Sequence, residues 1–211
     1  MNAPCLILDI GGVLEYTPRT GWPERWERLL ELPPHAIDER LRDVWQAGAI
    51  GGITEPEVHE QVAARLHLGP AQVEAFMADL WEEYLGTPNE ELIAHVRGLR
   101  GRARLGILSN SFVGAREREV PLYRFDELVE HIVYSHEIGT GKPDPRAYEI
   151  TCAELGVSPV DCLFIDDHAP NVEAARAVGM QAHLFEDNAS AIARIARHLG
   201  DGDGDGDGDV R

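Results

Sequence analysis

The sequence predicts an α/β protein with a doubly wound, Rossmann-like parallel sheet that is interrupted by an inserted block of helices. Three short apolar runs, each followed by polar residues, are typical of strands buried on both faces of a parallel sheet. These runs span residues 4–10, 103–108 and 161–165. Helical patterns follow the later runs, and such alternation is typical of this fold class. Residues 22–99 contain no clear strand, which indicates a separate helical block.

The remaining elements are predicted from apolar spacing and from residues that begin or end helices. Further strands are expected at 131–134 and 181–185, and helices at 144–155, 169–178 and 188–199. Pro143 directly precedes the first of these helices, and Gly156 and Gly179 directly follow the first and second, as is common at helix ends. Every one of these elements lies in the second half of the chain, beyond the helical block.

The inserted block divides into four or five helices. Its breaks fall at Pro33-Pro34, Gly51-Gly52, Gly69-Pro70 and the stretch from Gly86 to Pro88. The tryptophans of the block are expected in its own core rather than stacked on a substrate; they are Trp22, Trp26, Trp45 and Trp81. The predicted organisation is an α/β core from residues 1–15 and 100–200, the helical block at 16–99, and a tail at 201–211.

The chain is strongly acidic, with a formal charge of −18. Such a surface repels nucleic acid and anionic membranes, so neither is expected as a partner. An anion site would have to be built locally from amide groups, a lysine and a cation. The tail at 201–211 is an Asp-Gly repeat, which predicts disorder. It resembles the start of a calcium-binding loop, but position 212, the twelfth of such a loop, is absent.

Cysteine usage and hydropathy indicate a cytoplasmic protein. Cys5, Cys152 and Cys162 are odd in number and widely spaced, which argues against a disulfide framework or a zinc site. Reduced thiols fit a cytosolic compartment. The N-terminus shows no signal-peptide pattern, and no apolar run approaches membrane-spanning length.

Residues that could act in catalysis or bind a metal lie at the ends of three of the predicted strands. Asp9, Ser109 and Asp166-Asp167 lie at strand ends, where ligands bind in open α/β sheets, and Lys142 lies in a loop just before a helix. Carboxylates that lie together repel one another unless a cation sits among them, and hard oxygen ligands suit Mg²⁺. A carboxylate can also act as a nucleophile. Together these groups predict phosphoryl transfer through an aspartyl-phosphate.

The same residues form motifs that resemble the haloacid dehalogenase superfamily over residues 4–199. The motifs, in order, are Leu6 to Leu14, Leu108-Ser109-Asn110, Gly141 to Pro145, and Phe164 to Asp167. The inserted block is similar to the helical cap of the haloacid dehalogenase and phosphoglucomutase branch. The resemblance implies that Asp9 is the nucleophile, that Ser109 holds the phosphoryl oxygens and that Lys142 balances their charge.

The resemblance also implies the metal and substrate ligands. Asp9, the carbonyl of Gly11, and Asp167 would bind Mg²⁺, with Asp166 as a further ligand or an outer-sphere partner. Asn171 would support the metal shell. Asn110 and Gly12, which lie within the motifs, would contact the substrate.

One departure from the family pattern lies at Gly11. Family phosphatases usually have a second aspartate there, which protonates the leaving group and then activates water. General acid–base help is typically worth about 10²–10⁴-fold in rate. Some family sugar phosphatases resemble this chain in having Asp-x-Gly-x-Val. Glu15, His136 and His168 are the nearby candidates for the missing acid.

The function expected from these features is a Mg²⁺-dependent phosphatase for a small organic phosphate monoester, with sugar phosphates among the candidates. Two alternatives stay open. One is a metal-independent dehalogenase-like hydrolase in which Asp9 attacks carbon, although the family's dehalogenases resemble one another in an aromatic residue where Gly11 stands. The other is a binding or regulatory protein that lost activity with the acid. A monomer or homodimer is expected.

Overall fold

The computed structural model describes residues 3–201, and its centre is a five-stranded parallel sheet. The strands lie in the order β5-β4-β1-β6-β7. They are β1 (Cys5–Leu8), β4 (Arg104–Ser109), β5 (His131–Tyr134), β6 (Cys162–Asp166) and β7 (Gln181–Leu184). Each coincides with a run predicted as a strand, and the predicted fold class is confirmed.

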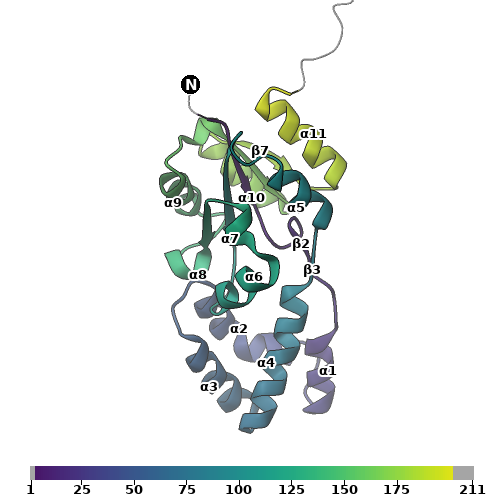
Figure 1. The fold of residues 1–211 in the computed structure, drawn as a ribbon. Coiled ribbons are helices and arrows are strands. Elements are labelled where there is room, and N and C mark those ends of the chain that lie inside the picture. The colour runs from purple at the N-terminus through teal and green to yellow at the C-terminus, as the bar shows by residue number, and fades with distance from the viewer. Residues whose placement is uncertain (1–2, 202–211) are drawn as a thin grey trace, which may run out of the picture.

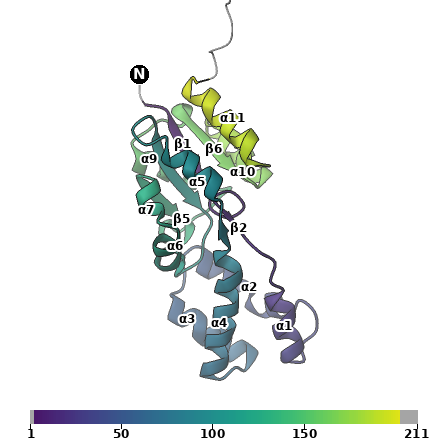
Figure 2. The same ribbon diagram turned by 45° about the vertical axis from the view of Figure 1, so that its right-hand side comes forward.

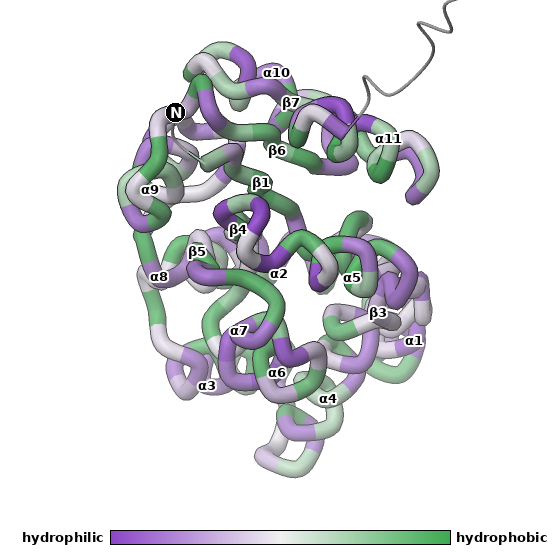
Figure 3. The backbone as a smooth tube through the Cα atoms, turned by 45° about the horizontal axis from the view of Figure 1, so that its top comes forward, coloured by the Kyte–Doolittle hydropathy of each residue, from purple (hydrophilic) through white to green (hydrophobic). Residues whose placement is uncertain are grey.

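Alternate residues of each central strand pack on opposite faces of the sheet, as strand geometry requires. Leu6 and Leu8 of β1 belong to the hydrophobic cluster on one face, whereas Cys5 and Ile7 belong to the cluster on the other. Hydrophobic clusters cover both faces of the sheet, and β1 and β6 accordingly have hydrophobic residues along most of their length (Figure 3). This explains why the sequence shows continuous apolar runs rather than alternation.

Two sets of helices cover the sheet. One face carries α5 (Glu90–Arg97), α7 (Phe125–Leu128) and α11 (Asn188–Leu199), and the other carries α9 (Pro145–Leu155) and α10 (Ala169–Ala177). The remaining elements between strands are α6 (Ala115–Tyr123), α8 (Ser135–Ile138) and a 3₁₀ turn at Pro159–Asp161. The helices predicted at 144–155, 169–178 and 188–199 are confirmed to within one residue at each end.

A bundle of four helices lies at one end of the molecule, below the sheet in Figures 1 and 2. Its members are α1 (Trp22–Leu29), α2 (Ala36–Ala49), α3 (Glu55–Leu66) and α4 (Pro70–Leu85). They bury a hydrophobic cluster of their own, in which all four tryptophans take part. The predicted breaks at the proline and glycine pairs coincide with the ends of these helices.

The helix α5 belongs to the α/β core, although the sequence placed it in the inserted block. Leu92, Ile93 and Val96 of α5 pack into the same hydrophobic cluster as β1, and α5 lies beside α11 in both ribbon views. We therefore propose residues 22–85 as the cap and the segments around them as the connection to the core. Helical periodicity identifies the apolar face of α5 but not the surface that covers it.

The connection between core and cap contains a small β-ribbon that the sequence did not predict. β2 (Glu15–Tyr16) pairs antiparallel with β3 (Thr87–Pro88). The prediction that residues 22–99 contain no strand was wrong at this point. A two-residue strand leaves no periodic pattern, so only the pairing partner reveals it.

The cysteines, the hydropathy of the helices and the C-terminal tail were the remaining subjects of the sequence predictions. All three cysteines are free and buried, and the Sγ atoms of Cys152 and Cys162 lie 3.9 Å apart. Within residues 3–201, no helix combines the length and apolar character needed to cross a bilayer. The predicted disorder and calcium-loop resemblance of the tail concern residues that, apart from Asp201, lie outside those described.

Candidate active site

The predicted catalytic residues meet at the carboxyl ends of three adjacent strands. Asp9 directly follows β1, Ser109 ends β4 and Asp166 ends β6. In the sheet β1 lies between β4 and β6, and the chain crosses from one half of the sheet to the other there. Such a switch point is where open α/β sheets bind ligands. The three positions, distant in the sequence, therefore share one crevice.

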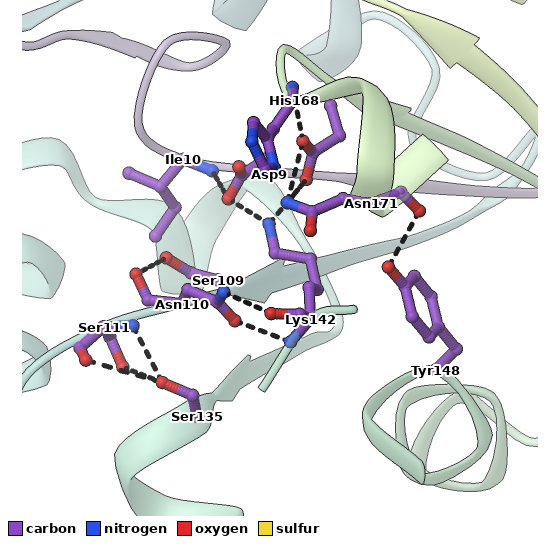
Figure 4. A network of polar contacts seen from close by, with 11 residues as sticks. Asp9, Ile10, Ser109, Asn110, Ser111, Ser135, Lys142, Tyr148, His168 and Asn171 are labelled. Carbon is purple, nitrogen blue, oxygen red and sulfur yellow. Dashed lines mark hydrogen bonds and ion pairs between the residues drawn. The ribbon is translucent and has the colours of Figure 1, made fainter. Parts of the chain in front are cut away.

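Lys142 binds two of these carboxylates at once. Its Nζ atom lies 2.7 Å from Oδ1 of Asp9 and 2.7 Å from Oδ2 of Asp166 (Figure 4). The side chains of Lys142 and Asp166 are fully buried, and that of Asp9 is 12% exposed. Asp9 therefore keeps slight contact with solvent, whereas Asp166 is enclosed. The arrangement can hold a negatively charged group beside Asp9, because the lysine charge is already there.

Two asparagines hold this ion pair in place. The side chain of Asn110 donates to the carbonyl of Lys142 at 2.7 Å and accepts from its N–H at 2.8 Å. Asn171 donates to both oxygens of Asp166 at 3.1 and 3.2 Å, and its own carbonyl accepts from the hydroxyl of Tyr148. The Asn110 amide was expected at the substrate, but in this structure its side chain binds the lysine loop.

Three carboxylates form a group that could hold a cation. One oxygen each of Asp9, Asp166 and Asp167 lies within 4.8 Å of the others. Asp166 already accepts hydrogen bonds from Lys142, Asn171 and the backbone N–H of His168, so its two oxygens are occupied. Asp9 and Asp167 are the more open members. Hard oxygen donors at this spacing suit Mg²⁺.

Gly12 allows Asp167 to reach this position. Its φ angle is +74°, which favours glycine, and a Cβ atom there would lie 2.2 Å from Oδ2 of Asp167. Gly12 was expected to contact the substrate. The structure gives it an additional steric role at the predicted metal site.

Burial and mutual repulsion raise the pKa values of the acidic groups. For Asp9 burial is the largest cause, the charge of Lys142 opposes it, and Asp166 adds to it. The pKa of Asp167 is raised by burial and by the charge of Asp166. A bound cation would offset both effects, because it favours the ionised carboxylates. The chemistry of the donor set therefore fits a divalent metal.

A cavity of about 270 Å³ opens beside Gly11, where the family pattern would place its second aspartate. Gly11, Glu15, Ser109 and Glu119 are among the residues that line it. A Cβ atom on Gly11 would have Glu15 Oε2 3.9 Å away. Burial raises the pKa values of both Glu15 and Glu119 to about 7. The cavity thus holds two carboxyl groups that are readily protonated near neutral pH.

The three candidates for the missing acid lie in different places. Glu15 is 2% exposed and lines the cavity with Gly11 and Ser109. His136 Nδ1 lies 2.6 Å from Ser111 Oγ, and burial lowers the pKa of this histidine. The side chain of His168 is exposed at the start of α10. Only Glu15 of the three is a lining residue of this cavity.

A second, larger cavity of about 460 Å³ lies between cap and core. It shares Thr17, Tyr84 and Asn110 with the cavity beside Gly11, so the two are neighbours. Trp22 and Trp45 line it while also packing in the cap core, where the sequence placed them. Sequence reasoning missed Tyr84, Glu119 and Phe112. Helical periodicity does not say which face of α4 or α6 meets a cavity, and Phe112 lies in a loop that shows no periodic pattern.

The cap is docked on the core at the edge of this cavity. Ser135 Oγ donates to the carbonyl of Ala49 in the cap at 2.7 Å and accepts from the N–H of Ser111 at 2.8 Å. Val113 N–H donates to the carbonyl of Gly48 at 3.2 Å. These bonds join α2 to the loops after β4 and β5. The fold and site together define a capped α/β hydrolase with a carboxylate beside a buried lysine.

Comparisons with known proteins give the family. A family model described as haloacid dehalogenase-like hydrolase matches residues 5–179, and the chain belongs to this family. Phosphatase MT3486 from Mycobacterium tuberculosis is 31% identical over 211 residues, a match that covers 94% of each chain. Phosphoglycolate phosphatase from Cereibacter sphaeroides is 29% identical over 133 residues, which cover 63% of this chain and 57% of that protein.

A solved structure shows the same fold. The HAD family enzyme from Bacteroides thetaiotaomicron, in complex with magnesium and inorganic phosphate, is 22% identical and has a TM-score of 0.74. The match covers 90% of this chain and 99% of that chain. The resemblance seen in the sequence motifs is thereby confirmed, and the chain is a hydrolase of this superfamily.

Proposed function

We propose that this enzyme is a Mg²⁺-dependent phosphatase that hydrolyses a small organic phosphate monoester through an aspartyl-phosphate on Asp9. The observation that carries the proposal is the position of Lys142, within 2.7 Å of both Asp9 and Asp166. A fixed cation at this point favours a nucleophilic carboxylate and an incoming phosphoryl group together. The related phosphatase from Mycobacterium tuberculosis supports this reading.

In the first step, an oxygen of Asp9 forms a bond to phosphorus while the bond from phosphorus to the ester oxygen breaks. The alcohol leaves after it gains a proton. In the second step, water attacks phosphorus and gives up a proton that restores the donor of the first step, the bond to Asp9 breaks, and inorganic phosphate is released. Lys142 and the hydroxyl of Ser109 hold the phosphoryl oxygens. Ser109 is 3% exposed and lines the cavity beside Gly11, which suits this role.

Asp9 and Asp167 would hold the metal, with the carbonyl of Gly11 as a further ligand. When bound, Mg²⁺ neutralises phosphoryl charge and polarises phosphorus for attack. Asp166 keeps Lys142 in place rather than binding the metal itself, because both of its oxygens accept hydrogen bonds from the protein.

Glu15 is our candidate for the proton donor to the leaving alcohol. It lines the same cavity as Gly11 and Ser109, and Thr17 Oγ1 donates to its Oε2 atom at 2.8 Å. The raised pKa of about 7 keeps a substantial fraction of this carboxyl protonated near neutral pH. A donor with such a pKa is suited to general acid catalysis at that pH.

The dehalogenase alternative has less support from the site. Attack of Asp9 on carbon needs no metal, yet Asp166 and Asp167 concentrate negative charge beside it. Mutual repulsion makes such a group costly without a cation. We also propose that the enzyme acts in the cytoplasm as a monomer or homodimer, where its three free thiols remain reduced.

The test is phosphate release from a panel of sugar, nucleotide and small-acid phosphates, with and without Mg²⁺. Asp9→Asn is compared with the wild type and with Asp126→Asn, which removes an exposed carboxylate on α7. We expect Mg²⁺-dependent release by the wild type and the Asp126 variant, and none by Asp9→Asn. Absence of release from every compound by a folded, Mg²⁺-binding wild type would favour the binding-protein alternative.

A further inference from the structure

The cavity of about 460 Å³ is placed to hold the organic part of the substrate. It shares Asn110, Thr17 and Tyr84 with the cavity that contains Gly11 and Ser109. A phosphoryl group at Asp9 therefore leaves the rest of the molecule directed toward the space between cap and core. Pockets of this size accommodate small organic ligands.

Aromatic rings form much of the wall of this cavity. The rings of Trp45 and Phe112 meet edge to face with centroids 5.7 Å apart, and Trp22 and Tyr84 are further lining residues. Trp22 and Phe112 are each 8% exposed, so their positions are fixed by surrounding packing. Such rings favour apolar or aromatic groups, and they attract cations through their electron-rich faces.

The charged lining residues of this cavity are all acidic. Asp38 on α2, an exposed residue, and Glu83 on α4, which accepts hydrogen bonds from Thr20, lie in the wall. No lysine, arginine or histidine is among the lining residues of either cavity, all of which belong to the described part of the chain. Lys142 is already held by Asp9 and Asp166 at the phosphoryl position.

We propose that the organic part of the substrate is neutral or cationic, has an apolar or aromatic face, and carries no second anionic group. This inference rests on the proposed phosphatase function and narrows its substrate class. A carboxylate or second phosphate in the cavity would face Asp38 and Glu83 with no lining cation to balance it. Phosphorylated acids would therefore be poor substrates, whatever related phosphatases hydrolyse.

The test uses three benzyl phosphates that differ only at the para position. The substituents are a carbamoyl group, its isosteric anion the carboxylate, and an aminomethyl cation. The methylene group separates the substituent from the ester oxygen, so the leaving alcohols have similar reactivity. We expect kcat/KM for the carbamoyl compound to exceed that for the carboxylate by about 10-fold or more, as repulsion by two nearby charges implies. The aminomethyl compound should be hydrolysed at least as well as the carbamoyl compound.

A charge variant shows whether the cavity causes this preference. Asp38→Asn should narrow the carbamoyl-to-carboxylate ratio by about 3- to 5-fold, because it removes one of the two carboxylates in the cavity wall. Glu39→Gln is the matched control, because Glu39 is an exposed neighbour on α2 and is not a lining residue. It removes the same charge from the surface and should leave the ratio unchanged.

The outcomes separate this inference from the proposed function. Equal hydrolysis of the carbamoyl and carboxylate compounds overturns the inference alone. Equal rejection of the anion and the cation also overturns it, because the cause would then be desolvation rather than the sign of the charge. Hydrolysis of other phosphates with none of the benzyl series overturns the assignment of the cavity. Absence of Mg²⁺-dependent release from every phosphate overturns the proposed function, and the inference with it.

Discussion

Replacing Gly12 with alanine is expected to weaken Mg²⁺ binding without unfolding the protein. A Cβ atom at this position would lie 2.2 Å from Oδ2 and 2.5 Å from Cγ of Asp167. Real Cβ contacts are longer than this, so the Asp167 carboxylate must move. Asp167 is one of the two more open carboxylates of the predicted metal site, so its displacement should lower the affinity for Mg²⁺.

Two effects contribute to the magnitude. The φ angle of Gly12 is +74°, and a non-glycine residue there costs about 1–2 kcal/mol in the free energy of unfolding. Displacing a group at a metal site typically lowers metal affinity by about 10- to 100-fold. We therefore expect a modest loss of stability together with a large loss of Mg²⁺ affinity.

Gly101→Ala separates the two effects. Gly101 has a φ angle of +80°, but a Cβ atom there would meet nothing within 4 Å. It should lose similar stability and keep the Mg²⁺ affinity of the wild type. Isothermal titration calorimetry would measure affinity, and denaturant unfolding would measure stability. Wild-type Mg²⁺ affinity in Gly12→Ala would refute the assignment of Asp167 to the metal site.

Three further changes test the groups around Asp9. Lys142→Met leaves Asp9 and Asp166 without their buried cation, so the free energy of unfolding at pH 7 should fall by about 3–5 kcal/mol, with a smaller loss at pH 5, in denaturant titrations. Glu15 has a folded-state pKa raised from 4.5 to about 7 by burial, so the wild type should lose stability as pH rises through this window. Glu15→Gln cannot ionise and should be more stable than the wild type at pH 8 by roughly 1–3 kcal/mol, a gain that disappears near pH 4 in the same titrations. Gly11→Asp should fit, since the nearest atoms to its Cβ lie 3.8 Å away, and in the Glu15→Gln background it should raise kcat by up to about 10²-fold on substrates with poor leaving groups. An unchanged kcat in that background would indicate that a group other than Glu15 donates the proton.

Sequence reasoning worked best where one local property decides the outcome. The strands ending at Asp166 and Ser109 were predictable because helices cover both faces of the sheet, and strands buried on both faces have continuous apolar runs. It failed where an element's partner decides its place. Residues 90–97 were predicted to belong to the helical block, but whether a helix there packs on the cap or on the core depends on surfaces distant in the chain.

The candidate site shows the same division. Strand ends and motif order predicted that Asp9, Lys142 and the Asp166-Asp167 pair lie together, and the structure brings them together. The hydrogen bonds of the Asn110 side chain were not predicted, since an amide has several possible partners and only the structure shows it bound to the Lys142 backbone. Glu119 lies on α6 without any motif, so its place beside Glu15 in a cavity could not be predicted.

The sequence by itself determined the five strands of the central sheet and the helices between the later ones, the acidic character of the surface and the residue types available for catalysis, because these follow from local pattern and composition. The tertiary structure decided how Lys142 pairs with Asp9 and Asp166, how Gly12 admits Asp167, and which aromatic and acidic side chains face the cavity between cap and core. The physical reason is that these contacts join residues far apart in the chain, and long-range packing sets their distances.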